Sequence, residues 1–225
     1  ENAGDRDRVQ RFWCAPTIAA KPGLKAVDMF RAIADGRIKA LWVMATNPVV
    51  SMPDAGNVKD AIAACPFVVV SDVTAETDTA QLAHVLLPAL AWGEKSGTVT
   101  NSERRISRQR SFLRAPGSAR PDWWIVSEVA KRMGHGEAFA YAEPEDIFAE
   151  HAALSAFEND GTRDFDIGAC ATLDPVAYDS LEPFHWPRRR GDGDPVRMFA
   201  DSRFYTSDRK ARIVPVRLAC EERAT

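Results

Sequence analysis

The hydrophobic pattern divides residues 24–88 into helical and strand-like segments that alternate along the chain. The helical segments place apolar residues three and four positions apart, whereas the strand-like segments are short, uninterrupted apolar runs. Buried strands that alternate with helices form right-handed crossovers and a parallel sheet. The sequence therefore predicts an α/β fold, a Rossmann-like parallel sheet with flanking helices. In order, the expected elements are a helix over 24–34, a strand over 40–45, a helix from 53, a strand over 67–70, a short helix within 74–82 and a strand over 84–87.

The pattern changes beyond residue 88, where strands and helices no longer alternate. Residues 159–194 are rich in Gly, Pro, Asp and Arg, so we expect a loop-like segment draped over another surface. The other expected elements are a strand or turn over 97–101, a basic run over 104–110, helices from 121 and 143, and a hairpin formed by 198–205 and 213–216. The expected domains are a lead-in segment (1–22), the Rossmann-like unit (23–118), a helical and loop-rich segment that belongs to a neighbouring domain (119–195) and the hairpin segment (196–225).

Composition narrows the class of protein. The 225-residue chain is 45% hydrophobic and 27% charged, which is typical of a globular protein with a sizeable core. Its 29 basic and 32 acidic residues give a net charge of −3, which argues against a general nucleic-acid binder because such a protein needs a basic surface. The longest apolar run, over 40–45, is far shorter than the roughly 20 residues that a membrane span requires. We expect no nucleic-acid partner and no membrane.

Cysteine spacing argues against several kinds of metal and redox site. Cys14, Cys65, Cys170 and Cys220 are widely separated and form no C-x-x-C pair. This disfavours a disulfide framework, a zinc knuckle or an iron–sulfur site made from this chain alone, and it favours scattered thiols in a reducing cytoplasm. The chain begins at Glu1 without an initiator methionine or a signal-type apolar stretch, so we expect an internal fragment of a longer, cytoplasmic protein.

Polar side chains follow the first two predicted strands. Thr46 and Asn47 come directly after the first strand, and Ser71 and Asp72 come after the second. In an open parallel sheet, ligands bind outside the carboxyl ends of the strands, where helix N-termini also point. An asparagine offers a donor and an acceptor, and an ionised aspartate accepts from paired donors such as a guanine edge or a ribose diol. The alternative interpretation is simple turn and helix-capping chemistry.

A second polar cluster covers residues 94–105. It combines a Gly-containing turn with Lys95, Asn101 and Arg105, and such a turn can meet phosphates or carboxylates, although a solvated charged hairpin is the alternative. No G-x-G-x-x-G or G-x-x-x-x-G-K-[ST] motif occurs, which disfavours NAD-type and ATP-type phosphate sites. His84 lies in an apolar run and is interpreted as a hydrogen-bonded core residue. No catalytic grouping of His, Ser or Cys is present, so the residues predict a dinucleotide-type binding lobe without a complete active site.

Several stretches of the chain resemble the assimilatory nitrate reductases, a branch of the molybdopterin oxidoreductases in the dimethyl-sulfoxide-reductase superfamily. The similarity extends over most of the chain, from about residue 11 to residue 216. The strand-end and Glu-Arg-Arg motifs are shared across the superfamily, whereas residues 92–110 and 150–155 point more narrowly to the nitrate branch. The stretches that carry the resemblance are 38–48 (IKALWVMATNP), 70–72 (VSD), 83–89 (AHVLLPA), 92–110 and 119–124 (ARPDWW).

The resemblance implies a cofactor, Mo-bis(molybdopterin guanine dinucleotide), with a 4Fe-4S cluster nearby. By the family's pattern, Asn47, Ser71 and Asp72 are expected to hold a guanosine end of this cofactor. The implied activity is the reduction of nitrate to nitrite by oxygen-atom transfer, with electrons from a donor protein or domain. All the residues expected to contact the dinucleotide are Thr46, Asn47, Ser71, Asp72, Lys95, Asn101, Arg105 and Asp122.

Three features of the family have no counterpart in this chain: the cluster-binding cysteines, the thiolate ligand of molybdenum and the C-terminal barrel. The resemblance therefore implies an internal part of a larger enzyme, with no catalytic or metal-ligating residue of its own. Its other domains are expected partners, the cluster is bound by a missing N-terminal part, and the hairpin segment leads into a missing C-terminal domain. Two alternatives stay open, a formate dehydrogenase of the same superfamily and a non-catalytic nucleotide-binding or scaffold subunit.

Overall fold

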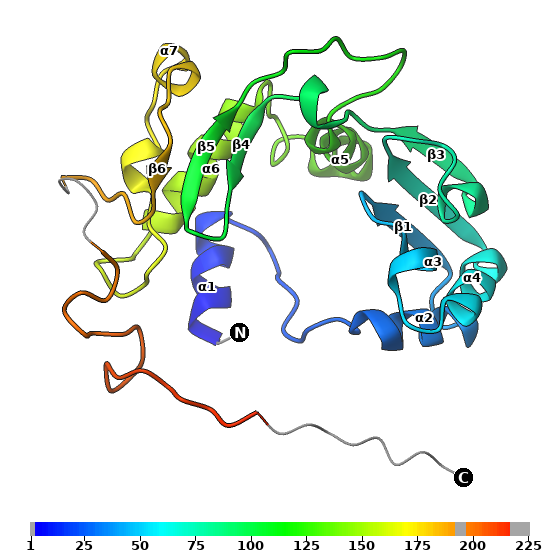
Figure 1. Ribbon diagram of the computed structural model, residues 1–225, viewed down its shortest axis with the longest axis horizontal. Helices are drawn as coiled ribbons and strands as arrows, with labels where there is room; N and C mark the ends of the chain where they lie inside the picture. Colours follow the sequence, from blue (N-terminus) through cyan, green and yellow to red (C-terminus); the bar gives the residue numbers. More distant parts are fainter. Residues whose placement is uncertain (1–2, 192–196, 217–225) are drawn as a thin grey trace.

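The computed structural model describes residues 3–191 and 197–216, which contain two three-stranded sheets and their surrounding helices (Figure 1). The strands of the first sheet are β1 (Ala40–Met44), β2 (Phe67–Asp72) and β3 (Val85–Pro88), and those of the second are β4 (Gly97–Thr100), β5 (Arg105–Gln109) and β6 (Phe184–His185). The α-helices are α1 (Ala3–Phe12), α2 (Ala26–Ala34), α3 (Pro48–Ser51), α4 (Ala55–Ala64), α5 (Asp122–Ala130), α6 (Pro144–Ala156) and α7 (Pro175–Asp179). Four short helical segments of other types are η1 (Ala80–Leu82), η2 (Trp92–Glu94), η3 (Lys131–His135) and η4 (Gly168–Cys170).

The first sheet is parallel in the order β1-β2-β3, which confirms the predicted α/β fold. Met44 of β1 pairs with Ser71 of β2, and Asp72 of β2 pairs with Pro88 of β3. This register brings the carboxyl ends of the three strands to one edge of the sheet, which faces α5 in Figure 1. The polar residues that follow β1 and β2 therefore lie at the same edge.

One hydrophobic core holds this unit together. Val68 and Val70 of the central strand are fully buried, and Ile33 of α2 and Ile62 of α4 belong to the same cluster. Valine suits this position because a β-branched side chain packs well on a pleated surface. In each helix the isoleucine lies three or four residues from another buried apolar residue, Phe30 in α2 and Val58 in α4, which gives the helix one apolar face. Burial of each such side chain contributes roughly 1.5–3 kcal/mol to folding. The core thus fixes the strands whose ends carry the polar residues.

The second unit is built around α6. Strands β4 and β5 form an antiparallel hairpin, and β6 pairs with β5. Ile106 of β5 is buried against Phe148 and Ala152 of α6. The domain boundaries stay a prediction, but this packing places the hairpin with the second core rather than with the parallel sheet of the expected unit 23–118.

Residues 159–191 differ from the loop-like segment that was expected. They include η4, α7 and β6, and Ile167, Cys170 and Tyr178 are buried in the second core. Single apolar residues between turn-forming residues carry no helical or strand period, so the pattern alone does not predict this core. The segment is therefore an integral part of the unit and not a loop laid over it.

Two further expectations differ from the structure. Residues 197–216 contain no strand, and instead the rings of Phe199 and Phe204 stack with their centroids 4.7 Å apart. A hairpin of two strands without a surface to pack on is at best marginally stable, and Ile213 is 95% exposed here. His84 is exposed at the edge strand β3 rather than buried, although its Nδ1 accepts a hydrogen bond from the Val68 N–H at 3.0 Å.

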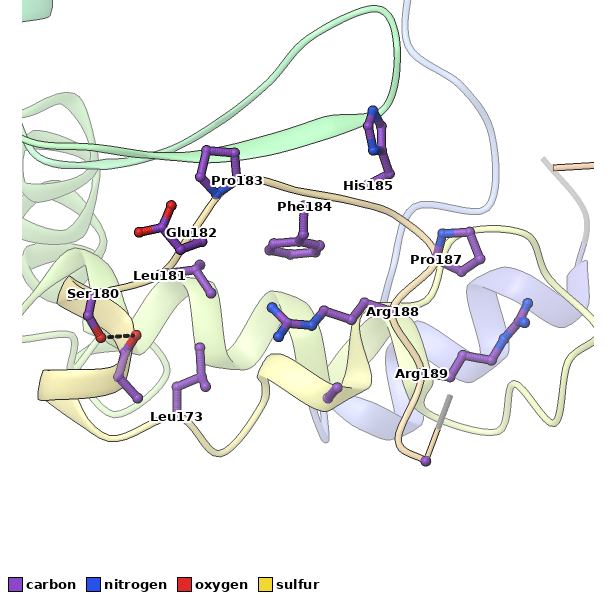
Figure 2. A pocket seen from close by; sticks show the side chains of 13 residues that line it. Leu173, Ser180, Leu181, Glu182, Pro183, Phe184, His185, Pro187, Arg188 and Arg189 are labelled. Carbon is purple, nitrogen blue, oxygen red and sulfur yellow. Dashed lines mark hydrogen bonds between the residues drawn. The ribbon is translucent and has the colours of Figure 1, made fainter. Parts of the chain in front are cut away.

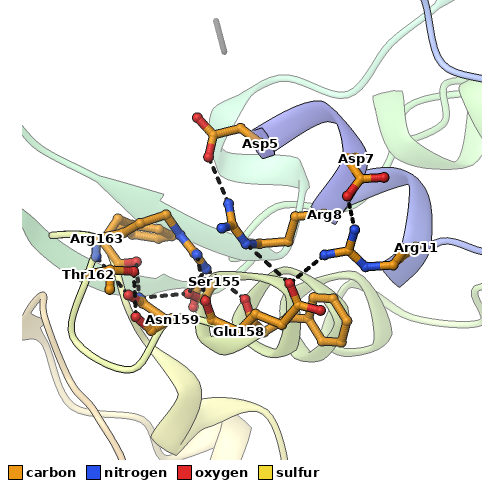
Figure 3. Close-up of polar contacts among 11 residues, drawn as sticks. Asp5, Asp7, Arg8, Arg11, Ser155, Glu158, Asn159, Thr162 and Arg163 are labelled. Atoms are coloured by element: carbon orange, nitrogen blue, oxygen red, sulfur yellow. Dashed lines mark hydrogen bonds and ion pairs between the residues drawn. The ribbon is translucent and has the colours of Figure 1, made fainter. Parts of the chain in front are cut away.

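Helix α1 packs on the second unit, although α2 belongs to the first. Figure 3 shows Arg8 and Arg11 of α1 pointing toward Glu158, with the Arg11 Nη2 atom 2.6 Å and the Arg8 Nε atom 3.6 Å from the Glu158 carboxylate. The ring of Phe12 meets that of Phe157 edge-on at 5.3 Å. Residues 14–25 then cross to the first unit (Figure 1). The expected lead-in segment 1–22 therefore includes a helix that contacts α6.

Helix α5 lies between the two sheets (Figure 1). The chain after β3 pairs with the residue that precedes α5, because Arg120 donates its N–H to the Pro88 carbonyl at 3.0 Å and accepts from the Leu90 N–H at 3.1 Å. This parallel bridge places Asp122, the first residue of α5, beyond the carboxyl end of β3. Asp122 is therefore a third polar residue at the carboxyl end of the sheet, after the polar residues that follow β1 and β2.

Candidate functional site

Asn47 follows β1 and is held by the loop that follows β2. Its Oδ1 atom accepts hydrogen bonds from the Thr79 hydroxyl at 2.6 Å and from the Thr79 backbone N–H at 3.3 Å. Since a backbone N–H can only donate, the side-chain oxygen must be the atom that faces Thr79. The amide NH₂ of Asn47 makes no hydrogen bond within residues 3–191 and 197–216, and the residue is partly exposed. Asn47 therefore keeps two donors for a ligand.

Asp72 ends β2, and its carboxylate is held by its own loop. One carboxylate oxygen accepts from the Val73 N–H at 2.7 Å, and the other accepts from the Thr77 hydroxyl at 3.4 Å. The Thr77 hydroxyl in turn accepts from the Ala80 N–H at 3.1 Å. An ionised carboxylate offers about four acceptor positions, so about two remain for a ligand. Asp72 is partly exposed, so these positions can be reached.

Loop 73–80 connects these two side chains. It leaves β2 at Asp72 and returns to the end of β1, where the fully buried Thr79 binds Asn47 and also accepts from the Val49 N–H at 3.3 Å. We call Asn47, Asp72, Thr77 and Thr79 the strand-end cluster. Sequence reasoning missed both threonines, although Ser and Thr near a strand end often bind neighbouring backbone and polar groups.

Ser71 and Thr46 occupy different environments at the same edge. Ser71 is fully buried, and its hydroxyl accepts a hydrogen bond from the Trp42 Nε1–H at 2.9 Å. A side chain without exposed surface does not contact a ligand directly, so the structure assigns Ser71 to the orientation of Trp42. Thr46 is exposed and follows Ala45, whose φ of 52° turns the backbone sharply at the end of β1.

Lys95 and Asp122 form an ion pair beyond the end of β3. The Lys95 Nζ atom lies 2.9 Å from Asp122 Oδ2, and each side chain is 30% exposed. As the first residue of α5, Asp122 also lies at the favourable end of the helix dipole for a carboxylate. Its Oδ1 atom is buried and has no hydrogen-bond partner among the described residues. A ligand can reach the exposed part of this ion pair, whereas the Oδ1 atom is covered by the chain itself.

Asn101 and Arg105 lie in the turn between β4 and β5. The Asn101 Oδ1 atom accepts from the N–H groups of Glu103 at 3.1 Å and Arg105 at 3.0 Å, and the Arg105 Nε atom lies 3.0 Å from the Glu103 carboxylate. The hydrogen bond from Asn101 and the charge of Arg105 lower the pKa of Glu103. Figure 1 shows this turn at the end of the hairpin that points away from the first sheet. The structure therefore does not bring Asn101 and Arg105 to the strand ends.

In residues 3–191 and 197–216, no three His, Cys, Asp or Glu side chains are grouped so that they could hold a metal ion. Cys14 is exposed, and Cys65 and Cys170 are buried free thiols, while Cys220 lies outside the described residues. Within the same residues, no helix has the length and apolar character that a bilayer crossing requires.

Residues 3–132 match the molybdopterin oxidoreductase family. A nitrate reductase of Klebsiella oxytoca is 54% identical over 212 residues, which cover 94% of this chain and 24% of that protein. A nitrate reductase of Shewanella frigidimarina is 49% identical over 209 residues, which cover 90% of this chain and 22% of that protein. A formate dehydrogenase alpha subunit of Methanocaldococcus jannaschii is 34% identical over 181 residues, which cover 80% of this chain and 24% of that protein. The chain spans about a quarter of the length of these curated relatives.

A solved structure has a similar fold. Acetylene hydratase from Pelobacter acetylenicus superposes with a TM-score of 0.59 at 20% sequence identity, over 82% of this chain and 23% of that chain. At this identity the likeness concerns the fold alone, and it agrees with the mixed α/β architecture described above.

Proposed function

The chain belongs to the molybdopterin oxidoreductase family, and from this premise we propose that its strand-end cluster binds a guanosine end of molybdopterin guanine dinucleotide in a nitrate reductase. The observation that carries the proposal is the unused hydrogen-bonding capacity of Asn47 and Asp72. Each side chain is fixed by contacts within the chain, yet Asn47 keeps two donors and Asp72 keeps about two acceptor positions.

Guanine matches this pair of side chains. Its N1–H and N2–H₂ groups are neighbouring donors, which a carboxylate can accept together, and O6 and N7 are acceptors for an amide NH₂. The Thr77 and Thr79 contacts hold both side chains before a ligand arrives, which lowers the entropy cost of binding. The position outside the carboxyl ends of parallel strands is also the general ligand position in open α/β sheets.

The other predicted residues divide by their surroundings. Lys95 and Asp122 are further contacts in this proposal, since each side chain is 30% exposed and the pair lies beyond the carboxyl end of β3. Ser71 acts by positioning Trp42. Asn101 and Arg105 are not part of the proposed contact surface because their hydrogen bonds close the β4–β5 turn. Thr46 is exposed beside Asn47 and stays a candidate contact.

The proposed whole enzyme extends beyond this chain. When bound, the molybdenum–pterin group supplies the electron-transfer chemistry that protein side chains lack, and the protein supplies binding and orientation. The metal ligands, the 4Fe-4S cluster and the contact to an electron donor are assigned in this proposal to parts of the enzyme outside the described residues. The cytoplasmic location, and a role in nitrate assimilation, stay predictions. The higher identity to nitrate reductases than to the formate dehydrogenase supports nitrate as the substrate.

The test of this function is a viologen-linked assay of the intact protein, together with its molybdenum and guanine nucleotide content. We expect turnover of nitrate, no turnover of formate and a bound guanine nucleotide. Turnover of formate without nitrate would overturn the choice of substrate. A purified protein that holds neither molybdenum nor pterin when expressed in a cofactor-producing host would instead support a scaffold subunit.

A further inference from the structure

A cavity of about 820 Å³ lies in the second unit, between η4, α7 and β6 (Figure 2). Leu173, Leu181 and Phe184 give it an apolar wall. Figure 2 shows the side chain of Arg188 running below the ring of Phe184 toward these leucines. The cavity therefore places a guanidinium group against an apolar surface, and no part of the proposed guanosine site lines it.

Three consecutive arginines follow β6 and meet different surroundings, and Arg188 and Arg189 line the cavity. Arg189 lies 3.8 Å from the Asp166 carboxylate and donates to the Tyr205 hydroxyl at 3.0 Å. Arg190 donates from Nε to the Gly168 carbonyl at 3.3 Å. Arg188 has no carboxylate or carbonyl partner for its guanidinium among the residues that the structure describes; its contacts are the Phe184 ring and the Cys170 thiol.

Backbone hydrogen bonds hold Arg188 beside η4, and its exposed side chain lies over the Phe184 ring. The Arg188 N–H donates to the Asp166 carbonyl at 2.7 Å, and the Arg188 carbonyl accepts from the Ala169 N–H at 3.2 Å. The guanidinium carbon lies 4.8 Å from the centroid of the Phe184 ring. A guanidinium over a ring face uses its π surface there, so the edge N–H groups that do not bond the Cys170 thiol stay available. These donors form a planar fork that matches two coplanar oxygen atoms.

The charges around the cavity favour an anion near Arg188. His185 and Arg189 also line the cavity, and Glu182 is the one carboxylate among the described lining residues. Figure 2 shows the Glu182 carboxylate pointing away from Arg188. Arg189 is paired with Asp166, so Arg188 is the arginine of the described lining that has no carboxylate partner and can attract an anion into the cavity.

We propose that this cavity binds a small planar oxyanion, such as nitrate or a carboxylate, through the guanidinium edge of Arg188. The proposal does not depend on the molybdopterin cofactor or on the strand-end cluster. The fork favours a planar oxyanion over a spherical ion of equal charge, because chloride cannot accept two parallel hydrogen bonds at two oxygen positions. A carboxylate side chain from polypeptide outside the described residues has the same chemistry, and the experiment separates it from a free ion.

The test is isothermal titration calorimetry of the intact protein with sodium nitrate, sodium formate and sodium chloride at constant ionic strength. We expect nitrate and formate to bind more tightly than chloride at a site that remains in protein prepared without molybdenum, in which the proposed active site is not loaded. Arg188→Ala is expected to weaken nitrate binding about tenfold or more, because it removes a charge-assisted fork. Arg188→Lys keeps the charge and is expected to lose the preference for nitrate over chloride. The matched control is Arg114→Ala, since Arg114 is exposed on the loop before α5.

Thermal unfolding of each variant shows whether it is folded. If Arg188→Ala is not folded, Arg188→Lys still tests the proposal. Equal affinity of the wild type for nitrate and chloride would overturn the proposal, as would unchanged nitrate binding in Arg188→Lys. Absence of any anion binding in the wild type would point to a carboxylate side chain in the cavity and would also contradict a free-ion site. None of these results bears on nitrate turnover, so failure here is distinguishable from failure of the proposed function.

Discussion

The strand-end cluster and the β4–β5 turn are both polar clusters built around an asparagine, yet they use their hydrogen bonds differently. In the turn, the carbonyl oxygen of Asn101 binds two backbone N–H groups, and Glu103 pairs with Arg105. In the strand-end cluster, Asn47 and Asp72 are each held from one side and keep unused donors or acceptors. The first arrangement stabilises its own backbone, and the second can also bind a ligand.

This difference teaches how a binding residue can be separated from a structural one of the same type. Both regions are rich in polar side chains, so polar density alone does not identify the site. What separates them is whether the chain itself satisfies the polar groups, because a group that already has its partners gains little from a ligand.

The substitution with the largest expected effect is Asp72→Ala. It removes the carboxylate that is proposed to accept from the guanine edge, while the loop loses only two hydrogen bonds. We expect cofactor binding to weaken by on the order of 1–3 kcal/mol. The measurement is the molybdenum and guanine nucleotide content of the purified intact protein, determined before and after dilution.

Two control variants sharpen this result. Asp78→Ala makes the same charge change at an exposed position of the same loop, and Arg105→Ala changes the β4–β5 turn. Both are expected to keep the wild-type cofactor content, because Asp78 is not held in place by a hydrogen bond among the described residues and Arg105 pairs with Glu103 in the turn. Equal loss of cofactor in Asp72→Ala and Asp78→Ala would mean that loop charge matters rather than a specific contact. Loss of cofactor in Arg105→Ala but not in Asp72→Ala would mean that the β4–β5 turn, and not the strand-end cluster, binds the cofactor.

A smaller effect is expected for Thr79→Val, which keeps the shape of a buried side chain and removes its hydroxyl. The Asn47 Oδ1 atom loses its shortest hydrogen bond and the Val49 N–H loses its acceptor. We expect the free energy of unfolding to fall by about 1 kcal/mol, measured by urea denaturation. The same change at exposed Thr100 is the control, with an expected effect within about 0.5 kcal/mol. Equal stability of Thr79→Val and the wild type would show that Thr79 does not fix Asn47.

The parallel sheet could be predicted from sequence because its signals are local. The apolar runs over 40–45, 67–70 and 84–87 became β1, β2 and β3 with boundaries shifted by one or two residues. The second sheet could not be predicted as a whole, because β6 pairs Arg105 with His185 across a long stretch of chain. Such pairing depends on tertiary packing around Ile106, which the local spacing of apolar residues does not predict.

The candidate site could be predicted only in part. The rule that ligands bind at the carboxyl ends of parallel strands identified the positions of Asn47 and Asp72. It could not show that Ser71 is covered by Trp42, because two residues separated by a crossover meet only in the folded sheet. The same limit hid Thr79, whose role depends on the return of loop 73–80 to β1.

The most direct test of the strand-end site is a crystal structure of the intact protein with its cofactor. The measured quantity is the distance from the Asp72 carboxylate oxygens to the guanine N1 and N2 atoms. We predict hydrogen-bond distances, at or below about 3.2 Å, with the Asn47 amide also in contact with the nucleotide. A guanine bound elsewhere, with its N1 and N2 atoms away from Asp72, would contradict the account.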